Sequence, residues 1–258
     1  MDTILAEQGV LLNYMRDPSR SEAFDPCRVL EDLYAGGAAL AMLPWQNGLR
    51  MAASDHLVLA TATDTGRCLG VLAASDRGTE REPFLFLDAA YLSPVARASV
   101  LLQRMLAIAL LRIAGNESVP SVIAACVQTP CYVSMLRAFG QSFDGAALFP
   151  AVPGDIVIDL GMASLARRIV RVVRPGSRCE AANGTFQTAA LAYASGGYAT
   201  AETLVIVDLS AASEASIYEE ARRLYRGRPA RGARRGRPTA MEDAALQQQP
   251  QLRDATAV

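Results

Sequence analysis

The sequence predicts an α/β protein built around a mixed sheet, and two patterns support this prediction. The first is a run rich in aromatic and branched residues, Pro83–Tyr91, followed by a long helical pattern over 95–114 and a second branched run over 121–127. Strands joined by a long helix form a right-handed crossover, so we expect these two to pair in parallel. The second pattern is a pair of branched runs, 56–63 and 67–74, separated by an Asp-Thr-Gly turn signal, which predicts an antiparallel hairpin.

The stretch Pro83–Asn116 is the one around which the rest of the chain is organised, and a long helix is predicted within it over 95–114. Its apolar residues recur at spacings of three and four, which indicates one core-facing side, and Gly115-Asn116 supplies the stop. The helix starts just after the strand 83–91. Its first N–H groups therefore lie at the C-terminal end of that strand, which predicts a site for an anion such as a phosphate.

Further elements are predicted on both sides of this unit. Asp25-Pro26 has the composition of a helix start, so we expect a helix from Cys27 to about Tyr34. Residues 38–44 fit either a strand or a continuation of that helix. The other predicted elements are a short helix (4–15), a turn (45–48), a charged loop (75–82), a short helix (131–139), a weak hairpin (146–149 and 156–160), a helix (162–173), two strands (185–194 and 202–209) and a helix (213–225).

The composition divides the chain into an N-terminal segment (1–26), a main domain (27–160), a C-terminal extension (161–225) and a tail (226–258). The extension either adds to the sheet of the main domain or forms a small α+β appendage. The tail is dominated by Gly, Pro, Arg and Gln, and we predict that it is disordered.

All basic residues of the chain are Arg, and the absence of Lys excludes a Schiff-base mechanism and a Walker-type phosphate clamp. Residues 1–221 hold 16 Arg and 23 Asp and Glu, a net charge of −7, whereas 222–237 hold eight Arg and no acid. The segment Arg222–Arg237 fits either a solubilising tail or a segment that binds RNA or an acidic partner.

The remaining signals concern metals and compartment. The five cysteines match no zinc or redox spacing, and we interpret them as reduced thiols. His56 is the only histidine, which excludes a His-rich metal site, and we expect it to be a half-exposed strand residue. The chain shows no secretory signal and no uncharged apolar run of membrane-spanning length. We therefore expect a cytoplasmic protein with no metal and no membrane contact.

Residues 27–160 follow the order helix, hairpin, strand, long helix, strand, short helix, hairpin. Two motifs accompany this order: Tyr91-Leu-Ser-Pro94-Val-Ala-Arg97-Ala98-Ser99-Val100 before and at the start of the long helix, and Thr129-Pro-Cys-Tyr132-Val-Ser-Met-Leu136-Arg-Ala-Phe-Gly140 over the short helix. By this order and these motifs the chain resembles the GNAT superfamily of N-acetyltransferases, as a divergent member. The resemblance implies an acyl-CoA N-acyltransferase-like fold, with 27–160 as the acetyltransferase-like domain.

The resemblance also implies a cofactor and roles for particular residues. The cofactor would be acetyl-CoA or another acyl-CoA, bound by Ala90, Tyr91, Leu92, Arg97, Ala98, Ser99 and Val100. The base that deprotonates the acceptor amine would be Asp88 or Glu82, and Tyr132 would replace the tyrosine that protonates the leaving thiolate. Pro94 and Arg97 match the pyrophosphate motif, whereas Val100 and Leu102 occupy its glycine positions and Leu136 occupies the tyrosine position.

Two functions of different classes remain open. The first is an N-acyltransferase that moves an acyl group from acyl-CoA to a small-molecule or protein amine. The second, favoured by the replaced glycines and tyrosine, is a catalytically silent binding or regulatory module. The sequence defines neither the acceptor nor the oligomeric state, for which a homodimer is one alternative.

Overall fold

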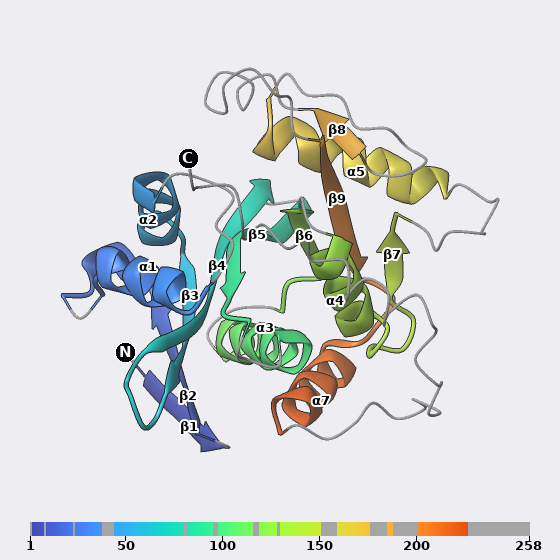
Figure 1. Cartoon of the computed structure of the whole chain (residues 1–258). Coiled ribbons are helices and arrows are strands. Elements are labelled where there is room, and N and C mark those ends of the chain that lie inside the picture. Colours follow the sequence, from blue (N-terminus) through green and yellow to red (C-terminus); the bar gives the residue numbers. More distant parts are fainter. Residues whose placement is uncertain are drawn as a thin grey trace, which may run out of the picture. The chain divides into compact units, whose positions relative to one another are not determined.

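The computed structural model describes residues 2–7, 9–22, 24–37, 44–79, 82–94, 98–115, 119–127, 130–150, 159–175, 185–187 and 201–226. The described strands form a single mixed sheet with helices on both faces (Figure 1). Their order in the sheet is β1-β2-β3-β4-β5-β6-β9-β7, and β8 also pairs with β9. The predicted α/β class with a mixed sheet is therefore confirmed.

The first five strands form an antiparallel meander. They are β1 (Asp2–Glu7), β2 (Val10–Arg16), β3 (His56–Ala62), β4 (Cys68–Thr79) and β5 (Glu82–Leu92), each paired with the next. The pairing of β3 with β4 confirms the predicted hairpin. Since β1 and β2 belong to this meander, the strands of the N-terminal segment lie in the same sheet as the main domain.

The central crossover confirms the parallel pairing predicted from the sequence. β5 leads through α3 (Ala98–Ala114) to β6 (Val122–Val127), and Leu85 to Leu87 of β5 pair in parallel with Ile123 to Ala125 of β6. β6 is followed by α4 (Pro130–Gly140), close to the predicted short helix.

The C-terminal extension adds to this sheet, which decides between the two alternatives left by the sequence. β9 (Ala201–Asp208) lies between β6 and β7 (Ala147–Phe149), antiparallel to both, and β8 (Thr185–Gln187) pairs with β9 beside β7. The described partner of β7 is thus β9, and not the segment 156–160 that the predicted hairpin required.

Two further helices come from the extension. α5 (Leu160–Val173) and α7 (Glu214–Tyr225) match the predicted helices closely. The Ser213 hydroxyl accepts a hydrogen bond from the Ser216 backbone at 3.2 Å, so Ser213 caps α7 as the sequence suggested.

Three other predictions were wrong. Residues 4–15 form strands rather than a helix, because β2 is buried on both faces from Leu12 to Met15 and so lacks the alternation that marks a half-buried strand. Residues 45–48 lie inside α2 (Pro44–Ala52), and the buried Gly48 faces Leu30 of the neighbouring helix. Residues 75–79 extend β4 instead of forming a loop, because they pair with β5.

Helices cover the two faces of the sheet differently. On one face, here called the α3 face, α3, α4 and α7 pack with β-strand residues such as Leu72 and Leu87 into the largest apolar cluster. On the opposite face there are two separate clusters. One joins α1 (Pro26–Ala35) and α2 to Ala73 and Ala89, and the other joins α5 to Phe84 and Phe86.

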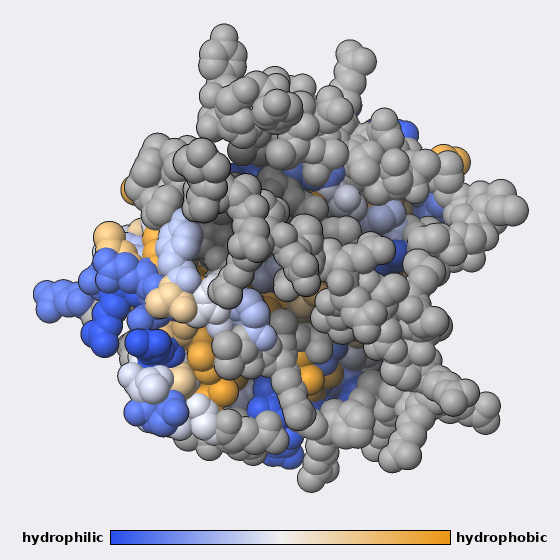
Figure 2. All heavy atoms as spheres, viewed as in Figure 1, coloured by the Kyte–Doolittle hydropathy of each residue, from blue (hydrophilic) through white to orange (hydrophobic). Residues whose placement is uncertain are grey.

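Helix α1 shows how the sequence sets the local structure. Its Asp25 cap accepts hydrogen bonds from the backbones of Cys27 and Arg28 at 2.9 and 3.3 Å, as predicted from Asp25-Pro26. Leu30 and Leu33 are buried, whereas Arg28 and Glu31 are exposed. Figure 2 accordingly shows hydrophilic side chains at the left of the molecule, where α1 lies.

Several predictions fall on segments that lie outside the described residues. These are the strand-or-helix alternative for 38–43, the C-terminal part of the strand 185–194, and the disordered tail from 227 onward with most of the Arg-rich segment. Among the described helices, none combines the length and the apolar character needed to cross a membrane.

Candidate active site

The parallel strands β5 and β6 separate after three paired residues. Beyond Leu87 and Ala125, β5 continues to Leu92 with β4 as its neighbour, and β6 continues to Val127 with β9 as its neighbour. No described strand pairs with the β6-facing edge of Asp88–Leu92. We call the space between the C-terminal ends of β5 and β6 the opening. In open α/β sheets, ligands bind outside the carboxyl ends of the strands.

Two backbone N–H groups of β5 point toward the opening. The Ser93 amide donates a hydrogen bond to the Leu69 carbonyl of β4 at 2.8 Å. Because N–H directions alternate along a strand, the amides of Ala90 and Leu92 face the other way, toward β6. Such donors can polarise a carbonyl group placed in the opening.

Tyr132 of α4 reaches the same edge of β5. Burial raises the pKa of Tyr132 to about 12, and a hydrogen bond with the Leu92 backbone opposes this rise. A hydrogen bond lowers the pKa of a phenol only if it stabilises the phenolate, so the Leu92 amide is the donor. With a pKa of about 12, the phenol is protonated at neutral pH. Leu136, one turn further along α4, is buried in the core.

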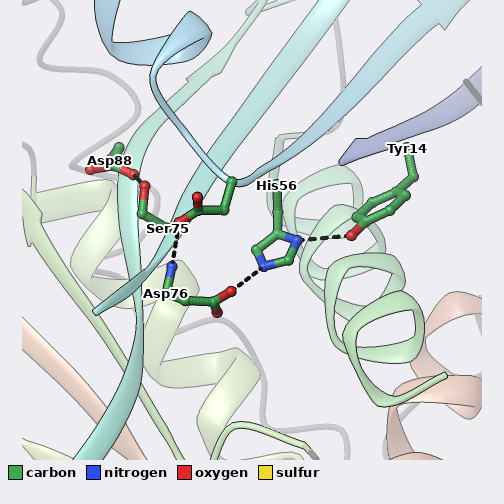
Figure 3. A network of polar contacts seen from close by, with 6 residues as sticks. Tyr14, His56, Ser75, Asp76 and Asp88 are labelled. Atoms are coloured by element: carbon green, nitrogen blue, oxygen red, sulfur yellow. Dashed lines mark hydrogen bonds and ion pairs between the residues drawn. The ribbon is translucent and has the colours of Figure 1, made fainter. Parts of the chain in front are cut away.

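Asp88 occupies a β-bulge at the start of the opening. Ala73 of β4 pairs with Ala89 and Ala74 pairs with Leu87, so Asp88 has no residue opposite it on β4. Its carboxylate accepts a hydrogen bond from the Ser75 hydroxyl of β4 (Figure 3). Bulges often re-aim a side chain next to an active site.

Asp88 lies on the face opposite to α3, between its two apolar clusters. Ala73 and Ala89 belong to the cluster under α1 and α2, and Phe86, which pairs with Ser75, belongs to the cluster under α5. Ser75 is 2% exposed and the Asp88 side chain is 14% exposed. A polar pair thus interrupts an otherwise apolar face, which indicates a chemical rather than a packing role.

The groups around Asp88 have opposing effects on its pKa. Burial raises its pKa, and the Ser75 hydrogen bond and the guanidinium groups of Arg77 and Arg50 oppose that rise, whereas Asp55 adds to it. The nearest of these cations is Arg77, whose Nη2 lies 3.6 Å from Asp88 Oδ1. A carboxylate with a raised pKa is a better base than an ordinary aspartate.

The structure places Glu82, the other predicted base, elsewhere. It begins β5, six residues before Asp88, which is about 20 Å along an extended strand. Its Oε2 accepts a hydrogen bond from Arg168 Nε of α5 at 2.9 Å, and both side chains are about half exposed. The structure therefore brings Asp88 and Tyr132 to the opening but not Glu82.

Helix α3 begins at Ala98, close behind the C-terminal end of β5. Arg97 lies outside the described residues, and only the backbone of Ala98 and Ser99 is described. Val100 is 44% exposed in the first turn, whereas Leu102 is 1% exposed and packs in the core. Of the two residues at the glycine positions, only Val100 can thus meet a ligand at the helix start.

A second polar network was missed by the sequence analysis. His56, expected to be half exposed, is 2% exposed on the α3 face. Its Nδ1 lies 2.8 Å from the Tyr14 hydroxyl and its Nε2 lies 2.9 Å from Asp76 Oδ2 (Figure 3). Asp76 follows Ser75, so adjacent residues of β4 serve the two networks on opposite faces. The apolar start of β3 hinted at burial, but the partners belong to segments that were predicted as helix and loop.

Comparisons with known proteins found similarity at the level of the fold. No protein-family model matches the chain, and no curated protein sequence matches it. Among solved structures, a GNAT superfamily phosphinothricin acetyltransferase from Sinorhizobium meliloti, in complex with acetyl-CoA, is 15% identical with a TM-score of 0.41, covering 77% of this chain and 88% of that one.

A diaminobutyrate acetyltransferase from Paenibacillus lautus, bound to its substrate and coenzyme A, is 13% identical with a TM-score of 0.39, covering 76% of this chain and 94% of that one. A ribosomal-protein-S5-alanine acetyltransferase from Vibrio fischeri is 10% identical with a TM-score of 0.40, covering 57% and 86%.

Proposed function

We propose that the protein is an acyl-CoA-dependent N-acyltransferase that acts on an amine. The observation that supports this best is the opening between β5 and β6, which has the Ala90 amide and the Tyr132 hydroxyl on it and the Asp88 bulge at its start. Acyl transfer to an amine needs these three elements: a donor for the acyl carbonyl, a proton donor for the leaving sulfur and a base for the amine.

Acyl-CoA fits the groups that surround the opening. The first-turn N–H groups of α3, with Ala98, Ser99 and the neighbouring Arg97, would hold the pyrophosphate through the helix dipole and one guanidinium. The segment Ala90–Leu92 would run beside the pantetheine arm, with the Ala90 amide on the thioester carbonyl. When bound, the cofactor supplies an acyl group activated as a thioester.

The residues then divide the proton transfers between them. Asp88 takes a proton from the acceptor amine, whose nitrogen forms a bond to the acyl carbon as the carbon–sulfur bond breaks. Tyr132 is anchored by the Leu92 amide and donates its O–H to the leaving sulfur. Because Asp88 and α3 lie on opposite faces of the sheet, the acceptor and the donor approach the opening from different sides.

A silent binding module is the second candidate, and Val100 favours it. Its side chain is 44% exposed at the turn where a pyrophosphate would approach the backbone, and a Cβ there weakens a close contact. In this alternative the protein still has the opening but transfers no acyl group. The identity of the amine acceptor, and the binding of RNA or an acidic partner by Arg222–Arg237, are further predictions.

Thermal unfolding with acetyl-CoA and longer acyl-CoAs tests the donor site, followed by an acyl-transfer assay on a panel of amines. A ligand at 100 times its Kd adds about 2.7 kcal/mol to the free energy of unfolding, so the melting temperature should rise. Binding followed by acylation supports the enzyme. Binding without acylation of any amine supports the silent module. No binding by any acyl-CoA rejects the enzyme and leaves the silent module as the better candidate.

A further inference from the structure

We propose that the acceptor is an amine that also carries a carboxylate, and that Arg50 of α2 binds this carboxylate while Asp88 receives the amine. The inference rests on the proposed function, because it concerns the acceptor side of the same site. It assigns the opposite face, between α2 and the bulge of β5, as the acceptor-binding surface.

The position of Arg50 follows from the packing of α2 on β5. Met51, the next residue, is fully buried in the cluster that contains Ala89, the neighbour of Asp88. Arg50 itself is half buried. Its guanidinium is close enough to influence the ionisation of both Asp88 and Tyr91. Arg50 therefore lies beside the bulge, on the face where the acceptor would arrive.

Arg50 differs from Arg77 and Arg168 in its contacts with the residues that the structure describes. Arg77 lies 3.6 Å from Asp88, and Arg168 lies 2.9 Å from Glu82. Within the described part of the chain, Arg50 makes no hydrogen bond and no ion pair. A half-buried guanidinium presents five donors in a planar fork, which matches a carboxylate.

The surroundings favour a zwitterion over a strongly anionic ligand. Two cations, Arg50 and Arg77, and two anions, Asp88 and Asp55, act together at the bulge, so the site has no excess positive charge. An acceptor with one amine and one carboxylate adds no net charge. Tyr91 is half buried and interacts with Arg50 and with Tyr34 of α1, and these rings offer apolar contact to the carbon chain between the two groups.

Binding of the acceptor's carboxylate to Arg50 would also raise the pKa of Asp88. Arg50 and Arg77 both hold the pKa of Asp88 down, against burial and Asp55, which raise it. A carboxylate paired with Arg50 offsets one of these cations, so Asp88 becomes a stronger base when the acceptor is bound. The acceptor's own anion would thus help to activate its amine.

Titration calorimetry of the full-length protein with saturating CoA tests the inference without requiring turnover. The probes are glycine, β-alanine and 4-aminobutyrate, each with its carboxamide and the aminoalkylphosphonate of equal length. We expect at least one carboxylate to bind ten-fold or more tightly than its carboxamide. Arg50→Gln should abolish this preference, Arg50→Lys should keep part of it, and Arg28→Gln on the exposed side of α1 should leave it unchanged.

Other results overturn the inference. They are equal binding of carboxylates and carboxamides, a preference that survives Arg50→Gln, tighter binding of the phosphonate, or no binding by any probe. Acetyl-CoA titrated in the same buffer separates this failure from that of the proposed function. If acetyl-CoA binds and plain amines are acylated without a carboxylate preference, only the acceptor assignment is wrong. If acetyl-CoA does not bind, the proposed function fails as well.

Discussion

The Nε2 atom of His56 and the Oδ2 atom of Asp76 lie 2.9 Å apart, and this contact joins β3 to β4 on the α3 face. The other ring nitrogen of His56 contacts the Tyr14 hydroxyl of β2 at 2.8 Å. Side chains from three neighbouring strands are thus connected around one buried imidazole. Because Asp76 directly follows Ser75, this network also fixes the segment of β4 that holds Asp88.

Replacing Asp76 by Asn should destabilise the protein in a pH-dependent way. The hydrogen bond to His56 holds the pKa of Asp76 below its usual value. A lowered carboxyl pKa gives stability that is present above the unfolded-state pKa, near 3.9, and is lost as the pH falls through the folded-state pKa. Because Asp76 is half exposed, we expect a loss of only about 1 kcal/mol at pH 7.

Urea unfolding of wild type and Asp76→Asn at pH 7, 5 and 3 measures this difference. It should shrink toward about pH 3, where the carboxyl of the unfolded chain is protonated. A difference of the same size at all three pH values would show that the contact acts by packing and not by charge.

Removing the Tyr14 hydroxyl tests the other half of the network. Tyr14→Phe leaves the ring in the core but takes away the partner of His56 Nδ1, and a buried polar group without its partner costs about 1–3 kcal/mol. Tyr218→Phe on the exposed side of α7 is the matched control and should change the free energy of unfolding by less than about 0.5 kcal/mol. Equal effects of the two changes would contradict a structural role of the Tyr14 hydroxyl.

The crossover β5-α3-β6 was predictable because its signals are local. The branched strands, the long apolar helix and its Gly115 stop all agree with the final structure. β2 and α2 could not be predicted from the sequence, because their structure depends on packing against distant parts of the chain. β2 is covered on both faces and so shows no alternation, and the turn-like residues up to Gly48 are helical because α2 packs against α1 and β5.

The candidate site was predictable in part. Asp88 and Tyr132 were named from the sequence, and the structure places both at the opening. Ser75 and Arg50 were missed, because their proximity to Asp88 depends on strand register and on how α2 packs. The bulge itself is a single extra residue in β5, and no sequence pattern marks it.

Gly140 at the end of α4 should not tolerate a side chain. A Cβ there would meet the partly buried Leu148 of β7 and would lie 2.9 Å from the core residue Val207 of β9. Gly140→Ala should therefore cost about 1–3 kcal/mol through overpacking. Gly115→Ala, where the nearest atom would be 3.5 Å away, is the control and should change the stability little. Urea midpoints compare the two, and an unaffected Gly140→Ala would mean that α4 can shift freely on the sheet.

The start of α3 makes a prediction about affinity for CoA. Val100→Gly should tighten binding if its Cβ keeps the pyrophosphate away from the backbone, at a cost of about 0.5–1 kcal/mol in helix stability. Arg97→Ala should weaken binding by about 1.5–3 kcal/mol, the usual value of a charge-assisted hydrogen bond. Titration calorimetry of the three proteins gives both numbers. Binding that is unchanged by Arg97→Ala would place the pyrophosphate elsewhere.

The buried charge of Asp88 should lower the free energy of unfolding at neutral pH. Burial raises its pKa in the folded protein, so the folded state holds its proton more firmly than the unfolded chain does. Stability is then greatest below the unfolded-state pKa and falls as the pH rises through the folded-state pKa. Asp88→Asn keeps an oxygen for the Ser75 hydroxyl and removes the buried charge. We expect it to raise the free energy of unfolding at pH 7 by about 0.5–2 kcal/mol, with no gain at pH 3.

The same substitution should lower acyl transfer by about 10²–10⁴-fold, the usual contribution of a general base. Glu82→Gln is the matched control, since it alters an exposed ion pair of the same strand and should change stability by less than about 1 kcal/mol and activity not at all. Urea unfolding and the acyl-transfer assay on both variants measure these effects. If removing this one buried carboxylate makes the protein more stable but less active, then the wild-type protein keeps Asp88 for catalysis and not for stability. If Glu82→Gln abolished transfer while Asp88→Asn did not, the base would be Glu82 and the bulge would serve only the fold.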